Sequence, residues 1–325
     1  MQTLWYDVKL PDLCTDLLKD DFKLTGPFVD GNPEDSLDGV EDADFLLLNA
    51  AFPGRNPDTY RLLVRVKAMV RFGVGYDNVD LDLATTHRVC VLNTPDGPSE
   101  STAEFAMLLI LNLARPMFDA TQRMRAGEWS KSSEPFGVEL AGKTLGLVGM
   151  GRIGSRLAEM ARGFRMRIVV HDPYISEEKA RALGVELVDD INEVYGAADF
   201  LSLHAPLLPG TRGLINREAI ARMKKGAYFV NAARGGLVIE KDLQEALENG
   251  HLAGAALDVW DPEPPAPDNP LAKLPNVIAT PHIASTTWDM RYKTTEMVKE
   301  TIHSYMRGER PPNLLNADAW ENRKL

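Results

Sequence analysis

Short apolar runs alternate with helix-like segments along most of this 325-residue chain. Runs such as Ala43–Ala50, Lys67–Gly73 and Arg88–Thr94 are bounded by Pro, Gly or Asn, as buried strands usually are. Short apolar runs of the same kind occur in the later segments TLGLVG, RIVVHD, DFLSLHAP, AYFVNAA, GAALDVW and NVIATPH. Strands that alternate with helices form parallel sheets with helices on both faces. The sequence therefore predicts an α/β fold.

The length of the chain favours two domains over one. A boundary is expected in the segment NTPDGPSESTAE, where prolines and a glycine end one unit. Ser101 and Glu104 are predicted to form a capping box that starts a long apolar helix. The final helix, from Met290 to Gly308, is expected to pack on the first unit. We therefore predict a discontinuous domain, residues 1–99 plus 288–325, and a continuous domain, residues 100–287.

Charge and composition exclude several classes of protein. The net charge is −11, without a basic cluster, so the chain is not expected to bind nucleic acid. The longest apolar run, Phe105–Ala114, is far shorter than the ~20 residues that cross a bilayer. The acidic residues and the proline near the N-terminus do not resemble a secretion signal. Cys14 and Cys90 lack metal-ligand spacing, so we expect a cytoplasmic protein without a metal site or a membrane partner.

A GxGxxG loop lies between a predicted strand and a predicted helix. In this loop Gly149 permits a tight turn, Gly151 lets the backbone approach a pyrophosphate, and Gly154 allows close contact between helix and strand. The helix then begins at Arg152 and Ile153, whose N–H groups would face the phosphates. The motif in this context predicts dinucleotide binding.

An acidic residue follows the next strand. Asp172 lies 18 residues after Gly154, close to the spacing at which a carboxylate accepts hydrogen bonds from the adenosine ribose. A carboxylate repels a 2′-phosphate, and the next residues, Pro173 and Tyr174, offer no arginine to receive one. The sequence therefore predicts NAD rather than NADP as the cofactor.

Three reactive side chains follow later strands. Arg234 offers a planar fork to carboxylate and carbonyl oxygens, and His282 is a natural proton donor near neutral pH. Glu263 beside that histidine would favour its protonated form. Each residue alone also has an ordinary structural explanation. Because ligands bind beyond the carboxyl ends of strands in doubly wound sheets, all three could face one crevice.

The order of these motifs resembles the D-specific 2-hydroxyacid dehydrogenase family. The resemblance rests on GxGxxG, Asp172, HAPL, NAARGG, DVWDPEP and TPHIAS, together with the earlier segments RFGVGYDNVD and STAE. It runs from about Asn49 to the end, and the segment GGLVIEKDL departs from a more acidic family pattern. The resemblance implies two Rossmann-like domains, an NAD-binding doubly wound parallel sheet and a smaller flavodoxin-like substrate domain.

The resemblance also implies roles for individual residues. Arg234, Glu263 and His282 would be the catalytic set, and Asp258 would lie near the nicotinamide amide. The cofactor cleft would be lined by Thr102, His204, Pro206, Thr211, Ala232 and Ala233. In the substrate domain, the N–H groups of Val74 and Gly75 would bind the substrate carboxylate, and Arg71 could reach a substrate anion. The segment Asn49–Gly54 would form a wall shaped by Phe52, and the helix from Ser101 would be a dimer element.

The predicted function is interconversion of a D-2-hydroxy acid and its 2-keto acid with NAD as the hydride carrier. Two other functions use the same scaffold. One is NAD-dependent recruitment of proteins, as in the C-terminal-binding-protein corepressors. The other is oxidation of a non-carbonyl anion, formate or phosphite. The residues do not identify the substrate.

Overall fold

The computed structural model describes residues 1–7, 10–26, 37–48, 52–129 and 136–324. The chain forms two compact units. The first comprises Met1–Pro98 and Thr286–Leu325, and the second comprises Ser99–Ser285. The first unit is therefore built from both ends of the chain.

The sheet of the first unit has five parallel strands in the order β2-β1-β3-β4-β5. This is the order of flavodoxin-like sheets. The strands are β1 (Gln2–Tyr6), β2 (Phe22–Thr25), β3 (Phe45–Leu48), β4 (Ala68–Arg71) and β5 (Cys90–Leu92). Every residue of β3, β4 and β5 is buried, which explains their unbroken apolar runs.

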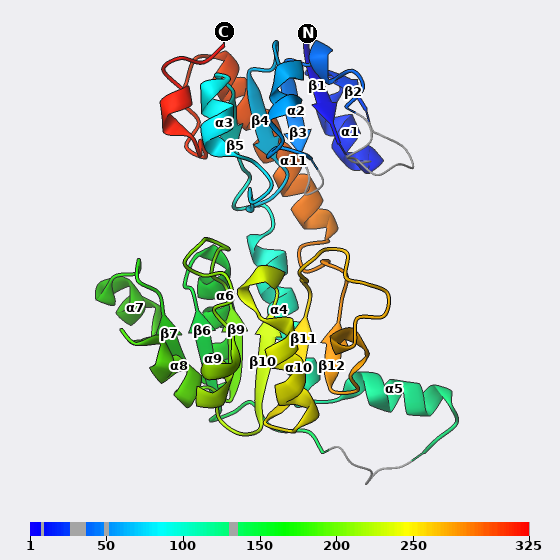
Figure 1. Cartoon of the computed structure of the whole chain (residues 1–325), viewed down its shortest axis with the longest axis vertical. Coiled ribbons are helices and arrows are strands. Elements are labelled where there is room, and N and C mark those ends of the chain that lie inside the picture. Colours follow the sequence, from blue (N-terminus) through cyan, green and yellow to red (C-terminus); the bar gives the residue numbers. More distant parts are fainter. Residues whose placement is uncertain (8–9, 27–36, 49–51, 130–135, 325) are drawn as a thin grey trace. The chain divides into compact units, whose positions relative to one another are not determined.

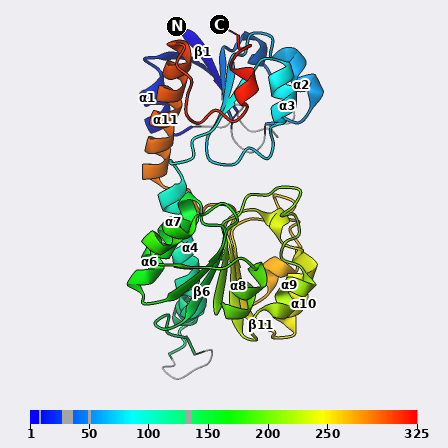
Figure 2. The same ribbon diagram turned by 90° about the vertical axis from the view of Figure 1, so that its left-hand side faces the viewer.

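Helices cover both faces of this sheet (Figure 2). One face carries α1 (Asp12–Leu18) and α11 (Trp288–Met306), and the other carries α2 (Pro57–Leu62) and α3 (Leu81–Thr86). The final helix buries Met290, Val298 and Ile302 against β1, β3 and β4. The first unit therefore obtains much of one core layer from the C-terminal end of the chain.

The segment after α11 covers the outer edge of β5. Leu314 bridges to Leu92, and the N–H of Leu315 donates to the carbonyl of Val91 (2.8 Å). The amide of Asn316 accepts from the N–H of Val91 (2.7 Å) and donates to the carbonyl of Val89 (2.9 Å). These bonds occupy polar backbone groups that a free edge strand would present to other chains.

The sheet of the second unit has seven parallel strands in the order β12-β11-β10-β9-β6-β7-β8. The order reverses between β6 and β9, which is the topological switch point of a Rossmann sheet. The strands are β6 (Thr144–Val148), β7 (Arg167–His171), β8 (Glu186–Leu187), β9 (Phe200–Leu203), β10 (Ala227–Asn231), β11 (Leu252–Leu257) and β12 (Val277–Ala279). The α/β fold class with two parallel sheets is thus confirmed.

Helices again form two layers (Figures 1 and 2). One face carries α4 (Ser99–Ala114), α6 (Arg152–Gly163) and α7 (Glu177–Leu183). The other carries α8 (Ile191–Ala197), α9 (Arg217–Arg222) and α10 (Glu240–Glu248). Short 3-10 turns occur at Val40–Asp42, Gly235–Leu237, Leu271–Lys273 and Ala317–Ala319.

The start of the long apolar helix differs from the prediction. Helix α4 begins at Ser99, directly after Pro98, so Ser101 and Glu104 lie inside it and do not form a capping box. The helix packs on α6, β10 and β11, and of its apolar side chains only Leu108 is classed as exposed. Its apolar composition is therefore explained mostly within its own unit.

A further helix carries the exposed apolar residues that α4 lacks. Helix α5 (Met117–Arg125) has no buried residue and projects away from the sheet of its unit (Figure 1). Met117, Phe118 and Met124 are each more than half exposed, and Trp129 follows with 73% of its surface exposed. Separately, none of the helices among the described residues is both long enough and apolar enough to cross a membrane.

Candidate active site

Three neighbouring strands of the second unit deliver the predicted reactive residues to one edge of the sheet. Arg234 follows β10, Glu263 follows β11 and His282 follows β12. The order β12-β11-β10 and the parallel pairing put the carboxyl ends of these strands side by side. Residues far apart in the sequence are therefore adjacent by topology.

Glu263 and His282 form a direct pair. Nδ1 of the imidazole lies 2.8 Å from Oε2 of the carboxylate, and both side chains are partly exposed. The other carboxylate oxygen, Oε1, accepts the backbone N–H of Trp260 (3.0 Å). Because Nδ1 faces the carboxylate, Nε2 is the nitrogen left to exchange a proton with a ligand.

The charge state of Glu263 follows from these contacts. Burial by itself would raise the pKa of the carboxyl group. The hydrogen bonds from His282 and Trp260, with the positive charges of His282 and Arg234, outweigh burial and hold the pKa below its ordinary value. Glu263 is therefore an anion throughout the neutral range.

Arg234 is presented by a turn that a buried asparagine holds. The amide of Asn231 accepts the N–H of Ala233 (3.0 Å) and donates to the carbonyl of Arg234 (2.9 Å). The guanidinium also donates to the carbonyl of Ala233 (2.6 Å). Asparagine at the end of a strand commonly forms such turns, so Asn231 could have been suggested by its position.

The loops of Arg234 and Glu263 are packed tightly against each other. A Cβ on Gly235 would lie 2.0 Å from the carbonyl carbon of Trp260, so only glycine fits there. The next residue after Trp260 is Asp261. Its carboxylate pairs with Arg212 (2.9 Å), and its N–H donates to the carboxylate of Glu240 (3.1 Å). Close packing and these bonds fix the arginine and glutamate loops relative to each other.

Asp258 directly follows β11 and has no exposed surface. Its carboxylate accepts hydrogen bonds from the loop that carries His282. The expected place of Asp258 near the nicotinamide amide stays a prediction.

The glycine loop shows the close approaches that its motif predicts. Gly149 has φ +95°, and a Cβ on it would lie 2.7 Å from the backbone of His204. A Cβ on Gly154 would lie 2.5 Å from the carbonyl oxygen of Gly149. A Cβ on Gly151 would meet no protein atom within 4 Å. Two glycines thus serve packing, whereas the third leaves backbone open to a ligand.

Asp172 lies next to this loop. Its Oδ2 accepts the N–H of Met150 (2.6 Å), and Oδ1 accepts the N–H of Tyr174 (2.8 Å). Arg152 and Ile153 begin α6 at the same edge and are at least partly exposed. The carboxylate and the start of α6 therefore both lie beside the glycine turn, where ribose and pyrophosphate are recognised in such folds.

The loop after β9 supplies further predicted cofactor residues. Burial lowers the pKa of His204 to about 4, so this ring is neutral, with Nε2 2.9 Å from the hydroxyl of Ser202. The hydroxyl of Thr211 donates to the carbonyl of Pro206 (2.7 Å) and accepts the N–H of Leu208 (2.8 Å). Thr211 therefore closes this loop on itself.

Three other predicted cofactor residues have little or no exposed surface. Thr102 and Ala232 are buried, and Ala233 is half-buried. Their roles toward a cofactor stay predictions.

The predicted substrate residues belong to the first unit. Arg71 is buried and donates through Nε to the carbonyl of Gly75 (3.0 Å), while the carbonyl of Val74 accepts from Asn93 (2.8 Å). These bonds hold the loop, and its contact with a substrate stays a prediction.

Phe52 is 2% exposed and packs edge-on against Trp5 in the core of the first unit, with ring centroids 6.2 Å apart. Its part in shaping a substrate wall stays a prediction. Residues 49–51, which the prediction also assigned to this wall, lie outside the described residues.

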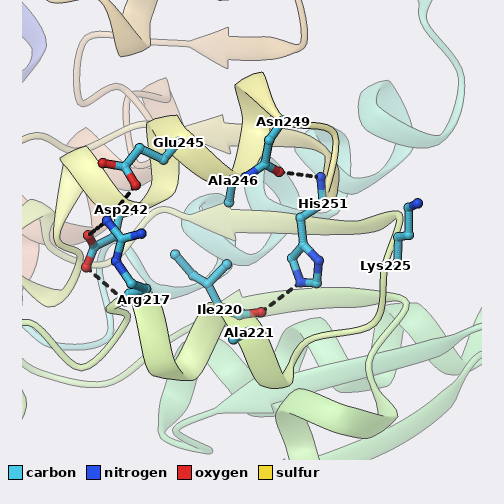
Figure 3. Close-up of a pocket in the computed structure, with 9 residues that line it drawn as sticks. All are labelled: Arg217, Ile220, Ala221, Lys225, Asp242, Glu245, Ala246, Asn249 and His251. Carbon is cyan, nitrogen blue, oxygen red and sulfur yellow. Dashed lines mark hydrogen bonds and ion pairs between the residues drawn. The ribbon is translucent and has the colours of Figure 1, made fainter.

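A surface pocket of about 430 Å³ lies elsewhere, between α9 and α10 (Figure 3). Arg217 there pairs with Glu245 (2.5 Å), and His251 contacts the carbonyl of Ile220 (3.0 Å). None of the predicted site residues lines it.

Comparison with known proteins agrees with this arrangement. Residues 107–284 match the model of the D-isomer specific 2-hydroxyacid dehydrogenase NAD-binding domain. The chain belongs to the D-isomer specific 2-hydroxyacid dehydrogenase family. A glyoxylate reductase of Korarchaeum cryptofilum is 40% identical over 87% of this chain and 85% of its own length.

Two other proteins extend the comparison. A D-3-phosphoglycerate dehydrogenase of Methanocaldococcus jannaschii is 45% identical over 90% of this chain. The match spans only 55% of that relative, so this chain accounts for about half of its length. The structure of Aquifex aeolicus D-lactate dehydrogenase with NAD and lactic acid is 27% identical, has a TM-score of 0.83, and covers 97% of this chain and 99% of its own.

The residues present fit the NAD that this domain type binds. The open space at Gly151, the exposed start of α6 and the carboxylate of Asp172 are the donor and acceptor set that a dinucleotide needs. NAD is thus the cofactor of this unit.

Two alanine substitutions in the glycine loop should have different effects. Gly151→Ala adds a methyl group to open space, so we expect stability to change by less than about 1 kcal/mol. The same methyl group should block the pyrophosphate and raise the Kd for NADH by about tenfold or more. Gly154→Ala should instead lower the free energy of unfolding by roughly 1–3 kcal/mol, because its methyl group overlaps a carbonyl oxygen. Denaturant titration and NADH fluorescence measure the two effects.

Gly163→Ala, at the end of the same helix, is the matched control. A Cβ there meets nothing within 4 Å, so NADH affinity should equal that of the wild type. If Gly151→Ala also leaves the affinity unchanged, the loop does not hold the pyrophosphate.

Proposed function

We propose that this chain interconverts a D-2-hydroxy acid and its 2-keto acid with NAD. The observation that carries the proposal is the Glu263–His282 pair, 2.8 Å apart, at the same sheet edge as the glycine loop. The names of the relatives support the substrate class, since they include a glyoxylate reductase, a D-3-phosphoglycerate dehydrogenase and a D-lactate dehydrogenase. Because the chain spans about half of the phosphoglycerate dehydrogenase, that protein's substrate does not transfer directly.

The chain's own side chains would handle charge and the proton. Bound NAD would carry the hydride, and reduction of a ketone leaves an alkoxide that must be protonated. His282 would donate that proton from Nε2 while Nδ1 stays bonded to Glu263. Arg234 would hold the substrate carboxylate or carbonyl oxygen.

The two directions of the reaction differ in the form of His282 that they need. The lowered pKa of Glu263 keeps its carboxylate ionised, so it remains the partner of Nδ1 in both directions. Ketone reduction uses the imidazolium, whereas alcohol oxidation uses the neutral ring. Oxidation should therefore have its optimum at a higher pH than reduction.

The role of His282 is tested by His282→Asn. With NADH and a panel of hydroxypyruvate, glyoxylate, pyruvate, phenylpyruvate and 3-phosphohydroxypyruvate, we expect the wild type to turn over at least one 2-keto acid. The variant should lose roughly 10²–10⁴-fold in turnover, the usual contribution of a positioned acid. Its NADH affinity should be nearly unchanged, because the glycine loop and Asp172 belong to other strands.

His251→Asn is the control, since this histidine lies in the pocket between α9 and α10, where its ring contacts the carbonyl of Ile220. Wild-type turnover in His282→Asn would remove His282 from the mechanism. Absence of turnover with every keto acid would favour NAD-dependent protein recruitment.

For the cofactor, we propose a preference for NAD over NADP through Asp172. Asp172→Ser removes the charge that repels a 2′-phosphate, so the ratio of NADPH to NADH dissociation constants should fall by roughly one to two orders of magnitude. Because Asp172 also accepts the N–H of Met150, NADH itself should bind somewhat more weakly. Side-by-side titrations measure the ratio.

Glu178→Gln is the matched control, because it removes an exposed negative charge from the neighbouring helix α7. In this variant the ratio of NADPH to NADH dissociation constants should stay at the wild-type value. A wild type that prefers NADPH contradicts the proposed role of Asp172.

We also propose that the chain forms a homodimer, with α5 rather than α4 as the main contact. Helix α5 leaves three large apolar side chains exposed, and such surfaces usually mark interfaces. A second copy is the proposed partner because closed twofold pairing is the commonest assembly of soluble proteins.

Phe118→Glu should shift the mass measured by light scattering from dimer to monomer at micromolar concentration, since a charge would be buried in the contact. Val64→Glu, which also replaces an exposed apolar residue but lies in the first unit, should leave the mass unchanged. A wild type that is monomeric across this concentration range contradicts the dimer.

A further inference from the structure

The amino ends of the strands of the first unit meet at one edge of its sheet. Because all five strands are parallel, this edge is opposite to the one that carries the predicted substrate loop after β4. A pocket of about 210 Å³ lies at the amino edge, between the starts of β1, β3 and β4 and the end of α11. It is lined by Gln2, Phe45, Lys67, Tyr305, Met306 and Gly308. The pocket therefore shares no residue with the proposed active site.

Lys67 is the cation that lines this pocket. Its Nζ donates to the uncharged side-chain amide of Gln2 (3.1 Å). The backbone carbonyl of Asp44 accepts the N–H of Lys67 (2.8 Å). The carboxylate of Asp44 faces the N–H of Thr3 (2.8 Å) and the guanidinium of Arg65 (3.8 Å) instead. Among the described residues, Lys67 thus has no carboxylate within ion-pair distance.

Arg323 brings a second cation to the rim of the pocket. Its guanidinium lies over the ring of Trp320, 3.7 Å from the centroid, and Nη1 donates to the carbonyl of Trp320 (2.7 Å). Nε is buried and has no hydrogen-bond partner among the described residues. A Cβ on Gly308 would lie 4.0 Å from Nη2. The stacked guanidinium is therefore held beside the pocket with donor groups left to bind a ligand.

Further positive charges lie at the same edge. Burial raises the pKa of Cys90, at the start of β5, to about 11, and the charges of Arg323 and Arg310 partly oppose this rise. Burial and the charge of Arg88 lower the pKa of Lys324 to about 8. The ammonium group of Lys324 donates to a backbone carbonyl (2.7 Å). Within the described parts of the chain, none of these four cations forms an ion pair.

The lack of carboxylate partners stands out in an acidic chain. Asp and Glu number 47 and Lys and Arg number 36, and the net charge is −11. Arg307, at the end of α11, pairs with both Glu300 (2.8 Å) and Glu309 (2.8 Å). Cations that gather around a hollow without such partners raise the local concentration of anions. The charge distribution at the amino edge therefore favours an anionic ligand.

The size and the remaining lining of the pocket constrain the rest of the ligand. A water takes ~30 Å³ in the liquid, so 210 Å³ gives room for about seven non-hydrogen atoms. Met306 lines the pocket and is half-exposed, and its flexible side chain can cover an apolar group. These properties suit a short carbon chain that ends in an anionic group.

We propose that this pocket is a binding site for a short-chain organic carboxylate. Lys67 and Arg323 would hold the carboxylate group, and Met306 would contact the carbon chain. The site uses none of the residues assigned to catalysis or to NAD, so it does not depend on the proposed function.

Titration calorimetry of the full chain with butanoate is the main test. We expect one site with a Kd in the millimolar range, an affinity that about six non-hydrogen atoms can supply. Butylammonium reverses the charge, and inorganic phosphate lacks the carbon chain, so each should bind at least about tenfold more weakly. Absence of butanoate binding overturns the proposal. Equal affinity for butylammonium or for phosphate also overturns it, because recognition would then ignore the charge or the chain.

Variants locate the bound butanoate. Lys67→Gln removes the charge and keeps a group that can bond to Gln2, so the Kd should rise by about tenfold. Arg323→Gln should have a similar effect, whereas Arg323→Lys keeps the charge and should restore most of the affinity. Thermal melting shows that each variant is folded. If Arg323→Gln does not fold, Lys67→Gln decides alone, and wild-type affinity in that variant overturns the proposal.

Two controls separate this pocket from other cationic groups. Arg307→Gln removes a nearby charge that already has carboxylate partners, so the Kd for butanoate should stay within about twofold. Arg234→Gln removes the arginine proposed to hold a substrate carboxylate, and it should also leave the Kd unchanged. A tenfold loss of affinity in Arg234→Gln places butanoate at the proposed active site and overturns the inference. An equal loss in Arg307→Gln reduces the effect to net charge and overturns it as well.

Discussion

All strands of the second unit run in one direction, and this constraint determines where its chemistry can lie. Parallel pairing requires each strand to end at the same edge, so the loops after β6, β7, β9, β10, β11 and β12 share it. The switch point between β6 and β9 separates the two helix layers there and leaves the edge open to a dinucleotide. The glycine loop and Asp172 lie toward one side, and Arg234, Glu263 and His282 follow the three strands of the other. One topological rule thus brings together residues more than a hundred positions apart.

Short-range contacts then determine the geometry within that edge. Gly149 and Gly235 allow backbones to meet at distances that any side chain would prevent. Carboxylates have the complementary role of accepting hydrogen bonds. Asp172 accepts from a backbone N–H beside the glycine loop, and Asp258 accepts from backbone N–H groups beside His282. Glycine permits close approach, and a carboxylate satisfies the donors that close approach leaves without partners. The two residue types together keep polar backbone groups hydrogen-bonded at this edge of the sheet.

The sequence predicts the elements whose physical signal is local. Strands such as β3, β4 and β10 are buried on both faces, so they read as apolar runs between turn residues. Strand β2 mixes polar and apolar residues at a sheet edge, and β8 has two residues, so neither has such a signal. The residue types of Arg234, Glu263 and His282 suggest their chemistry. The burial of Asp258 and Phe52 could not be predicted, because burial depends on partners distant in the sequence. The contact of Thr280 was missed because its partner, the carboxylate of Asp258, is distant in the sequence and no motif encodes the pair.

The first unit is assembled from both ends of the chain, and this has a consequence during synthesis. Its sheet is complete by residue 92, yet one face of that sheet needs Met290, Val298 and Ile302, and the edge of β5 needs Asn316. The second unit is continuous and has all its strands by residue 279. On the ribosome, the order of folding is therefore the reverse of the order of synthesis, since the unit whose strands emerge first must wait for the last helix. Until then the nascent chain carries an uncovered apolar sheet face and an open strand edge, which makes this interval the one in which a chaperone has most to protect.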